Sequence, residues 1–207
     1  MLRKIRKDEI PALARISAEC FYDYPVYQIF FPNEEKRLEC LFYHFQIRLY
    51  LMQNYSYVTE NEDMLISVQR PGDKNHSLLG LLLNPRFFFG ALKCLPLSFL
   101  PNLISYERTT KRVLKQYYNP KTDDYVGAAC VLKKSRFSGV FFAALRELDQ
   151  GRPVCAETHT ARNLKLYQYI GAELCDTIEW KGIPHYVLRR TDTPKDKPHS
   201  KAKDQTD

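Results

Sequence analysis

Residues 151–174, GRPVCAETHTARNLKLYQYIGAEL, carry the most information about the fold of this chain. A glycine-containing turn leads into a short apolar run, and a polar corner with Glu157, Thr158 and Asn163 follows it. An amphipathic helix then places Tyr167 one turn after Asn163, and Gly171 ends that helix. The spacing predicts a strand, a polar corner, a short helix and a second strand.

The rest of the chain surrounds this unit with further strands and helices. Apolar alternation predicts strands at 2–6, 55–60, 64–69, 78–83, 125–132, 154–157, 173–180 and 185–189. Helical periodicity predicts a helix pair before residue 55, with Asn33 capping the second, and further helices at 87–118, 139–148 and 161–170. This order predicts a single α+β domain, residues 1–190, built on a central mixed sheet flanked by helices. Residues 191–207 have no apolar anchor and are expected to form a disordered polar tail.

The charge pattern weighs against nucleic acid as a partner. The net charge is +7, yet the tail holds four lysines and four aspartates, so the excess lies in residues 1–190, where it is scattered. A scattered excess is typical of a solvated surface or an anionic ligand, whereas nucleic-acid binding needs a basic stripe. We therefore expect no nucleic-acid partner.

The apolar and cysteine patterns indicate a cytoplasmic protein without a membrane partner. The apolar segment 78–104 is interrupted by charged residues and prolines, so we expect a buried strand and packed helices there, not membrane contact. The six cysteines lie far apart, which is typical of small buried side chains in a reducing compartment. The histidines show no metal-ligand spacing, so no metal is expected.

Two blocks of sequence resemble the GNAT superfamily of acyltransferases: VLKKSRFSGVFFAAL at residues 131–145 and ETHTARNLKLYQYIG at residues 157–171. The resemblance extends over most of residues 3–190. It implies a GNAT-like sheet and the transfer of an acyl group from coenzyme A to an amine, with acetyl-coenzyme A as the co-substrate.

The resemblance also implies which residues bind coenzyme A. The family's pyrophosphate loop follows the pattern Gln/Arg-x-x-Gly-x-Gly/Ala, and a helix N-terminus there receives the anion. Arg136 and Gly139 match its first two defined positions, whereas Phe141 replaces the small third residue. Val131 and Lys133 would bind the pantetheine arm through their backbone groups. The other cofactor-binding residues that the resemblance implies lie in the loop and in the two helices that follow: Arg136, Phe137, Ser138, Gly139, Val140, Phe141 and Asn163.

By the same resemblance, Tyr167 is the general acid that protonates the departing thiolate, since a neutral phenol can donate a proton. Many family members carry a base on the central strand, but this strand offers only Ala128, Ala129 and Cys130. Glu157 on the neighbouring strand is the nearest alternative, acting through water, while a purely structural hydrogen bond is the other reading of that carboxylate.

Two functions remain open on the sequence alone. The first is an N-acetyltransferase acting on an amine of a small molecule or peptide, with homodimer formation possible. Aromatic residues at 21–31 and 87–89 would then favour an apolar or aromatic acceptor. The second is a non-catalytic binding or regulatory module of the same fold, in which Phe141 weakens coenzyme A binding.

Overall fold

The computed structural model describes residues 1–77, 85–136 and 138–191. Within these residues, seven strands form one mixed sheet in the order β1-β2-β3-β4-β5-β7-β6, and β4 and β5 are the one parallel pair among them. The strands are β1 (Leu2–Lys4), β2 (Ser56–Thr59), β3 (Met64–Gln69), β4 (Asp124–Val131), β5 (Val154–Thr158), β6 (Glu173–Trp180) and β7 (Ile183–Arg190).

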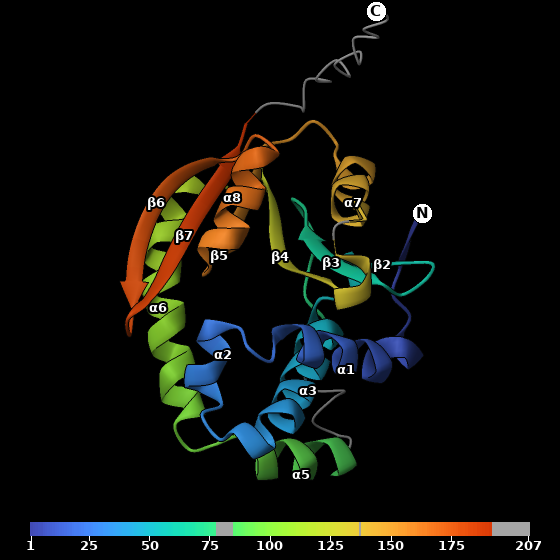
Figure 1. Ribbon diagram of the computed structural model, residues 1–207, viewed down its shortest axis with the longest axis vertical. Coiled ribbons are helices and arrows are strands. Elements are labelled where there is room, and N and C mark those ends of the chain that lie inside the picture. The colour runs from blue at the N-terminus through green and yellow to red at the C-terminus, as the bar shows by residue number, and fades with distance from the viewer. Residues whose placement is uncertain (78–84, 137, 192–207) are drawn as a thin grey trace, which may run out of the picture.

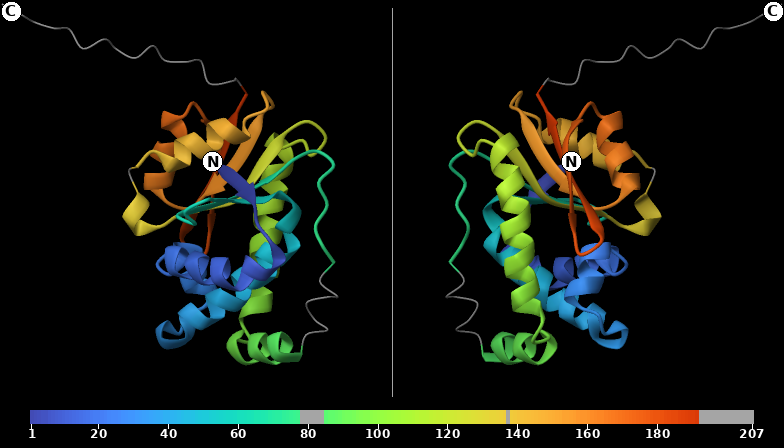
Figure 2. Two further views of the ribbon diagram at one scale, coloured as in Figure 1. Left: turned by 90° about the vertical axis from the view of Figure 1, so that its right-hand side faces the viewer. Right: turned by 90° about the vertical axis from the view of Figure 1, so that its left-hand side faces the viewer.

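Helices cover both faces of this sheet. They are α1 (Ile10–Phe21), α2 (Pro25–Phe30), α3 (Glu34–Leu51), α5 (Pro85–Cys94), α6 (Phe99–Tyr117), α7 (Val140–Leu148) and α8 (Ala161–Tyr169). Short 3-10 turns are η1 (Lys7–Glu9), η2 (Gln53–Tyr55) and η3 (Lys133–Ser135). Figure 2 shows α7 and α8 on one side of the sheet and α6 on the other, while α1, α2, α3 and α5 gather at its lower end in Figure 1. The expected α+β fold with a central mixed sheet is confirmed.

The centre of the sheet opens where β4 and β5 part. Their parallel pairing covers only Asp124–Val126 of β4 against Val154–Ala156 of β5. Beyond it, Gly127 forms a bulge against β3, because Val126 pairs with Val68 while Ala128 pairs with Ser67. A Cβ on Gly127 would lie 2.6 Å from the end of the Met52 side chain, so glycine lets α3 and its C-terminal turn approach β4. The strand edge of residues 127–131 that faces β5 therefore has no β5 partner.

Strand alternation sorts the residues of β4, β5 and β7 onto two faces. Tyr125, Cys155 and Val187 pack with α6, while Val126 and Ala156 pack with α7 and Tyr167 of α8. A separate and larger core lies beneath, where the aromatic rings of α2 pack with those of α3 and α6. The sheet thus separates the α6 side from the α7 and α8 side, and side chains from both sides reach the place where β4 and β5 part.

Several expectations need correction. The stretch 87–118 forms two helices, α5 and α6, because the chain turns around Pro96. Ala91 and Cys94 of α5 are buried, and exposed apolar side chains occur along this region: Phe88, Phe89, Leu92, Leu97, Leu100 and Ile104. The α5 helix packs against α3, but these side chains leave an apolar surface exposed beside it. Within the described residues, no helix has the length and apolar character needed to cross a membrane. The expected strand at 78–83 and the polar tail at 192–207 lie outside the described residues.

Candidate active site

A cavity of about 140 Å³ lies where β4 and β5 part. Its walls come from the β4 segment 125–129, the β5 end at 157–159, α8, and aromatic residues of α2, α3 and α6. Both predicted catalytic residues, Tyr167 and Glu157, line it, and so does Asn163. The sheet opening therefore brings together side chains that belong to opposite faces.

Tyr167 reaches the cavity from the α7 and α8 side of the sheet. Thr160 caps α8 by accepting a hydrogen bond from the Asn163 backbone N–H at 3.2 Å, and Tyr167 follows one turn later. Burial, and then the neighbouring Tyr24, raise the pKa of the Tyr167 phenol above its ordinary value. The group therefore stays protonated at physiological pH and can serve as a proton donor.

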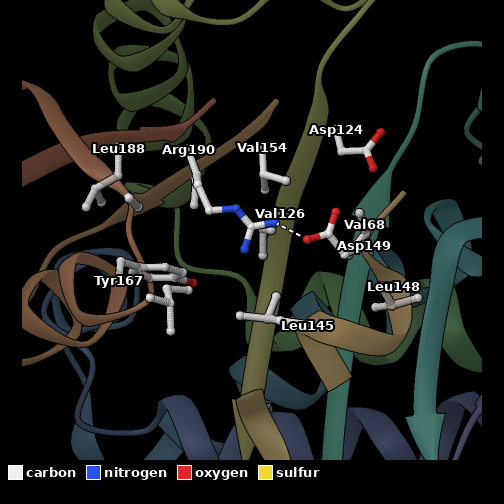
Figure 3. Close-up of a pocket in the computed structure, with 13 residues that line it drawn as sticks. Val68, Asp124, Val126, Leu145, Leu148, Asp149, Val154, Tyr167, Leu188 and Arg190 are labelled. Carbon is white, nitrogen blue, oxygen red and sulfur yellow. Dashed lines mark hydrogen bonds and ion pairs between the residues drawn. The ribbon is translucent and has the colours of Figure 1, made fainter. Parts of the chain in front are cut away.

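Tyr167 also borders a second, smaller cavity of about 30 Å³. Figure 3 shows Tyr167 facing Leu145 and Leu148 of α7 across this space, with Val126 and Val154 on the sheet beneath. An ion pair between Arg190 Nη2 and Asp149 Oδ2, 2.6 Å long, bridges β7 and the end of α7 at its edge. The Tyr167 ring is thus held between two cavities by apolar contacts.

Glu157 lies on the opposite face, and both of its carboxylate oxygens bind side chains. Tyr125 Oη donates to Oε2 at 2.5 Å, and His185 Nε2 lies 3.0 Å from Oε1. The alternation of β4, β5 and β7 puts all three residues on the α6 face. Burial alone would raise the pKa of Glu157, but His185 and Tyr125 bring it below its ordinary value, so the carboxylate is ionised.

A chain of hydrogen bonds continues from Glu157 to the cavity wall. His185 is fully buried, and its Nδ1 lies 2.8 Å from Nε2 of His159. Nδ1 of His159 lies 3.1 Å from Tyr24 Oη, which accepts the His159 backbone N–H at 2.9 Å. The phenol of Tyr106 lies 2.9 Å from the same Nε2 of His159. Burial, and then the neighbouring His185, lower the pKa of His159 to about 3, so this imidazole is neutral.

Comparisons with solved structures identify proteins with a similar fold. An acetyltransferase from Corynebacterium glutamicum, named as histone acetyltransferase HPA2 and related acetyltransferase, matches with a TM-score of 0.60, covering 93% of this chain and 96% of its own at 9% identity. An acetyltransferase of the GNAT family from Streptococcus agalactiae matches with a TM-score of 0.53, covering 94% of this chain and 96% of its own at 11% identity. The chain has the GNAT fold.

A third structure is similar to the same extent. An N-acetyltransferase from Staphylococcus aureus matches with a TM-score of 0.52 at 14% identity, covering 91% of this chain and 99% of its own. No protein-family model matches the sequence, and no curated protein is significantly similar to it.

The expected cofactor loop of the GNAT fold joins β4 to α7. Gly139 is the N-cap of α7 and has φ 80°, a left-handed conformation that favours glycine. The first backbone N–H groups of α7 lack intrahelical partners, as at every helix N-terminus, so they can receive an anion. Arg136 lies before this turn and donates from Nε to the Val131 carbonyl at 3.5 Å, while Ser138 donates from Oγ to the Ser135 carbonyl. Phe137 lies outside the described residues.

Phe141, where the GNAT pattern has a small residue, is in the first turn of α7. Its ring is partly buried against the β3 and β4 core and lies 5.9 Å from the Tyr167 ring, edge to face. The ring therefore packs inward, against the phenol that would act as acid, while Val140 beside it packs on the same core.

The expected backbone site for the cofactor arm lies on the free edge of β4. The Leu132 N–H bonds the Asp63 carbonyl on the β3 side, so the preceding residue, Val131, directs its backbone groups toward the open side. The strand ends at Val131, however, and Lys133 begins η3. We had expected Lys133 to lie on the strand, and the structure instead places it after the strand end.

Sequence reasoning gave Tyr24 a place only among the aromatic residues of the acceptor region, and it missed the roles of Arg48, His159 and His185. Their distance in sequence hides them, since they come from α2, α3, the β5 end and β7. A partial signal existed, because His185 lies in the second strand of a predicted hairpin that could pair beside Glu157. No group of three His, Cys, Asp or Glu side chains suited to a metal ion occurs in the described part of the chain.

Proposed function

We propose that the protein is an N-acyltransferase of the GNAT superfamily that transfers an acetyl or other acyl group from coenzyme A to an amine of a small molecule or peptide. One observation carries the proposal: the opening between β4 and β5 joins a protonated phenol, Tyr167, to a buried hydrogen-bond chain that ends on the ionised Glu157.

The residues present fit coenzyme A. The backbone N–H of Val131, on the β4 edge that has no β5 partner, can serve an extended arm, since the Val131 carbonyl already accepts from Arg136 Nε. The α7 N-terminus behind Gly139 and the remaining N–H groups of Arg136 offer donors and positive charge to a pyrophosphate. Asn163, on the cavity wall, would bind or orient the arm. The group would supply an acyl thioester at the opening. No metal is required for this chemistry.

The two sides of the opening take opposite roles. Tyr167 holds the proton that a departing thiolate needs, and its raised pKa keeps that proton in place until then. On the other side, Tyr24 Oη receives a proton from the acceptor nitrogen and gives its own to Nδ1 of His159. His159 cannot retain a charge, because its pKa is about 3, and releases a proton from Nε2 to Nδ1 of His185.

Glu157 takes up no proton itself but stabilises the charged His185. Its carboxylate lies 3.0 Å from His185 Nε2 and compensates the imidazolium formed there. The chain Tyr24–His159–His185–Glu157 thus takes the place of the water that the sequence analysis expected between Glu157 and the acceptor.

All six cysteines are free thiols, which suits a reducing compartment such as the cytoplasm.

Two measurements test the proposal in sequence. Calorimetric titration with acetyl-coenzyme A should show binding in the micromolar range, and desulfo-coenzyme A should bind as well. A screen of polyamines, aminoglycosides, amino acids and arylamines, read by thiol release, should then find an acceptor. Binding of coenzyme A without acylation of any amine would favour the non-catalytic module instead. Absence of both would reject the proposal.

A further inference from the structure

Arg48 brings a positive charge into the wall of the cavity. It lies on the buried face of α3, one turn after His44 and Phe45, and its side chain is partly buried. Nη1 donates to Tyr27 Oη at 3.2 Å, and Nη2 donates to the Gly127 carbonyl at 2.9 Å. The guanidinium has five N–H donors, so these two bonds leave donor capacity for a ligand in the cavity.

The charge of Arg48 has no counter-charge in the described part of the protein. Both hydrogen-bond partners are neutral, and none of the ion pairs between described residues includes Arg48. Burial keeps the pKa of the Tyr27 and Tyr125 phenols above their ordinary values, so neither phenol supplies negative charge. His44 beside it is neutral, because burial and then the charge of Arg48 lower its pKa to about 3.

The acidic side chain on the cavity wall is already engaged. Glu157 is the single Asp or Glu among the described residues that line the cavity, and its two oxygens bind Tyr125 and His185. A cation taken out of water costs several kcal/mol unless an anion or several hydrogen bonds compensate it. No carboxylate of the described cavity wall contacts Arg48, so its guanidinium borders the cavity without a directly bound anion.

We propose that Arg48 binds the carboxylate of the acceptor, so that the acceptor is an amino acid with an apolar or aromatic side chain. This rests on the proposed acyl transfer, because it assigns the acceptor of that same site. A guanidinium matches a carboxylate with two parallel hydrogen bonds. The rings of Phe21, Tyr27 and Phe30 on the same wall suit an apolar side chain. One guanidinium balances a single negative charge, which favours a carboxylate over a phosphate dianion.

The test uses three molecules that share one ring: phenylalanine, phenylalaninamide and phenethylamine. For the wild-type protein with acetyl-coenzyme A, kcat/KM from thiol release should be about 10- to 100-fold higher for phenylalanine, since hydrogen bonds to charged groups are worth that much. Leucine and isopentylamine repeat the comparison without the ring.

Arg48→Gln removes the charge and keeps a donor for the Gly127 carbonyl. We expect its kcat/KM to fall about 10- to 100-fold more for phenylalanine than for phenethylamine, so that the preference is lost. Arg48→Lys keeps the charge without the planar fork and should retain part of the preference. Arg15→Gln, an exposed arginine on α1, is the matched control and should behave as wild type. Circular dichroism establishes that each variant is folded.

The outcomes separate this inference from the proposed function. Equal transfer to all three molecules, or a preference that survives Arg48→Gln, overturns the role of Arg48 and leaves acyl transfer standing. If no amine is acylated, calorimetric titration of phenylalanine and phenethylamine into the complex with coenzyme A decides. Tighter binding of phenylalanine that Arg48→Gln abolishes supports the carboxylate site, and equal binding refutes it. If Arg48→Gln does not fold, Arg48→Lys and the wild-type preference carry the test.

Discussion

Acidification from pH 7 to pH 5 should destabilise this protein through two buried histidines, His44 and His159. Burial, and then Arg48 for the first and His185 for the second, lower their pKa values to about 3, against 6.5 for an unperturbed histidine. Between pH 6.5 and pH 3 these two imidazoles are protonated in the unfolded chain but remain neutral in the folded protein. The stabilising contribution is therefore complete above pH 6.5 and is lost as the pH falls toward 3.

The size of the effect follows from the two pKa values. At pH 5 each histidine favours the unfolded state by about 2 kcal/mol relative to pH 7, and the two together by about 4 kcal/mol. Glu157 adds to the loss in the same direction, because its pKa is lowered in the folded state. Domains are stable by about 5–15 kcal/mol, so this is a large fraction of the total.

Urea unfolding at pH 7 and pH 5 measures the difference, and the lone tryptophan, Trp180, is buried and reports it by fluorescence. His44→Leu has similar volume and removes a buried Nε2 that lacks a hydrogen-bond partner in the described structure. It should halve the pH dependence, whereas His76→Leu, on a surface loop, is the control. Equal urea stability at both pH values, or an unchanged pH dependence in His44→Leu, would refute the reasoning.

Four further predictions concern the site. Tyr167→Phe should lower kcat by about 10²–10⁴-fold with little change in thermal stability or acetyl-coenzyme A affinity, because the described structure gives its hydroxyl no hydrogen bond; Tyr169→Phe on the same helix is the control, and unchanged turnover would show that Tyr167 only packs. Glu157→Gln should lower kcat/KM by about 10²-fold or more without loss of acetyl-coenzyme A affinity in calorimetry; a loss of stability alone would make the carboxylate structural. Phe141→Gly should cost about 2–3 kcal/mol in urea unfolding, because its partly buried ring packs on the core and glycine weakens α7, and tighter cofactor binding would show instead that the ring crowds the loop. Gly139→Ala should cost about 1–2 kcal/mol and weaken acetyl-coenzyme A binding, since φ is 80° there; no effect on either would argue against the strained cap.

The strands and helices near the site were predictable because they depend on local patterns. The apolar run at 125–132 becomes β4 at Asp124–Val131, and the polar corner after residue 157 leads into α8 as its spacing predicted. Asn33 caps α3 as expected, accepting from the Lys36 N–H at 3.2 Å. Such features need only neighbouring residues, so one sequence contains them.

The hydrogen-bond chain from Tyr24 to Glu157 and the position of Arg48 were not predictable for the opposite reason. Tyr24 and His159 lie 135 positions apart and meet only because α2 packs under the end of β5. Arg48 shares a helix face with Phe45 and Leu41. The apolar pattern of that face predicts core packing and gives no sign that a charged side chain on it borders a cavity. Whether a polar residue faces a cavity depends on tertiary packing, which helical spacing alone does not define.

The alternation that puts Glu157 and His185 on one face also constrains the hairpin turn between β6 and β7, which does not line the cavity. Val187 opposes Glu157 in the β5 and β7 pairing, and the Lys181–Gly182 turn, with φ of 51° and 78°, leads directly into β7. Adding or deleting one residue between this turn and His185 would shift the ladder by one position and direct the imidazole to the α8 face. We therefore expect natural and engineered variants to tolerate substitutions in this hairpin far better than single-residue length changes.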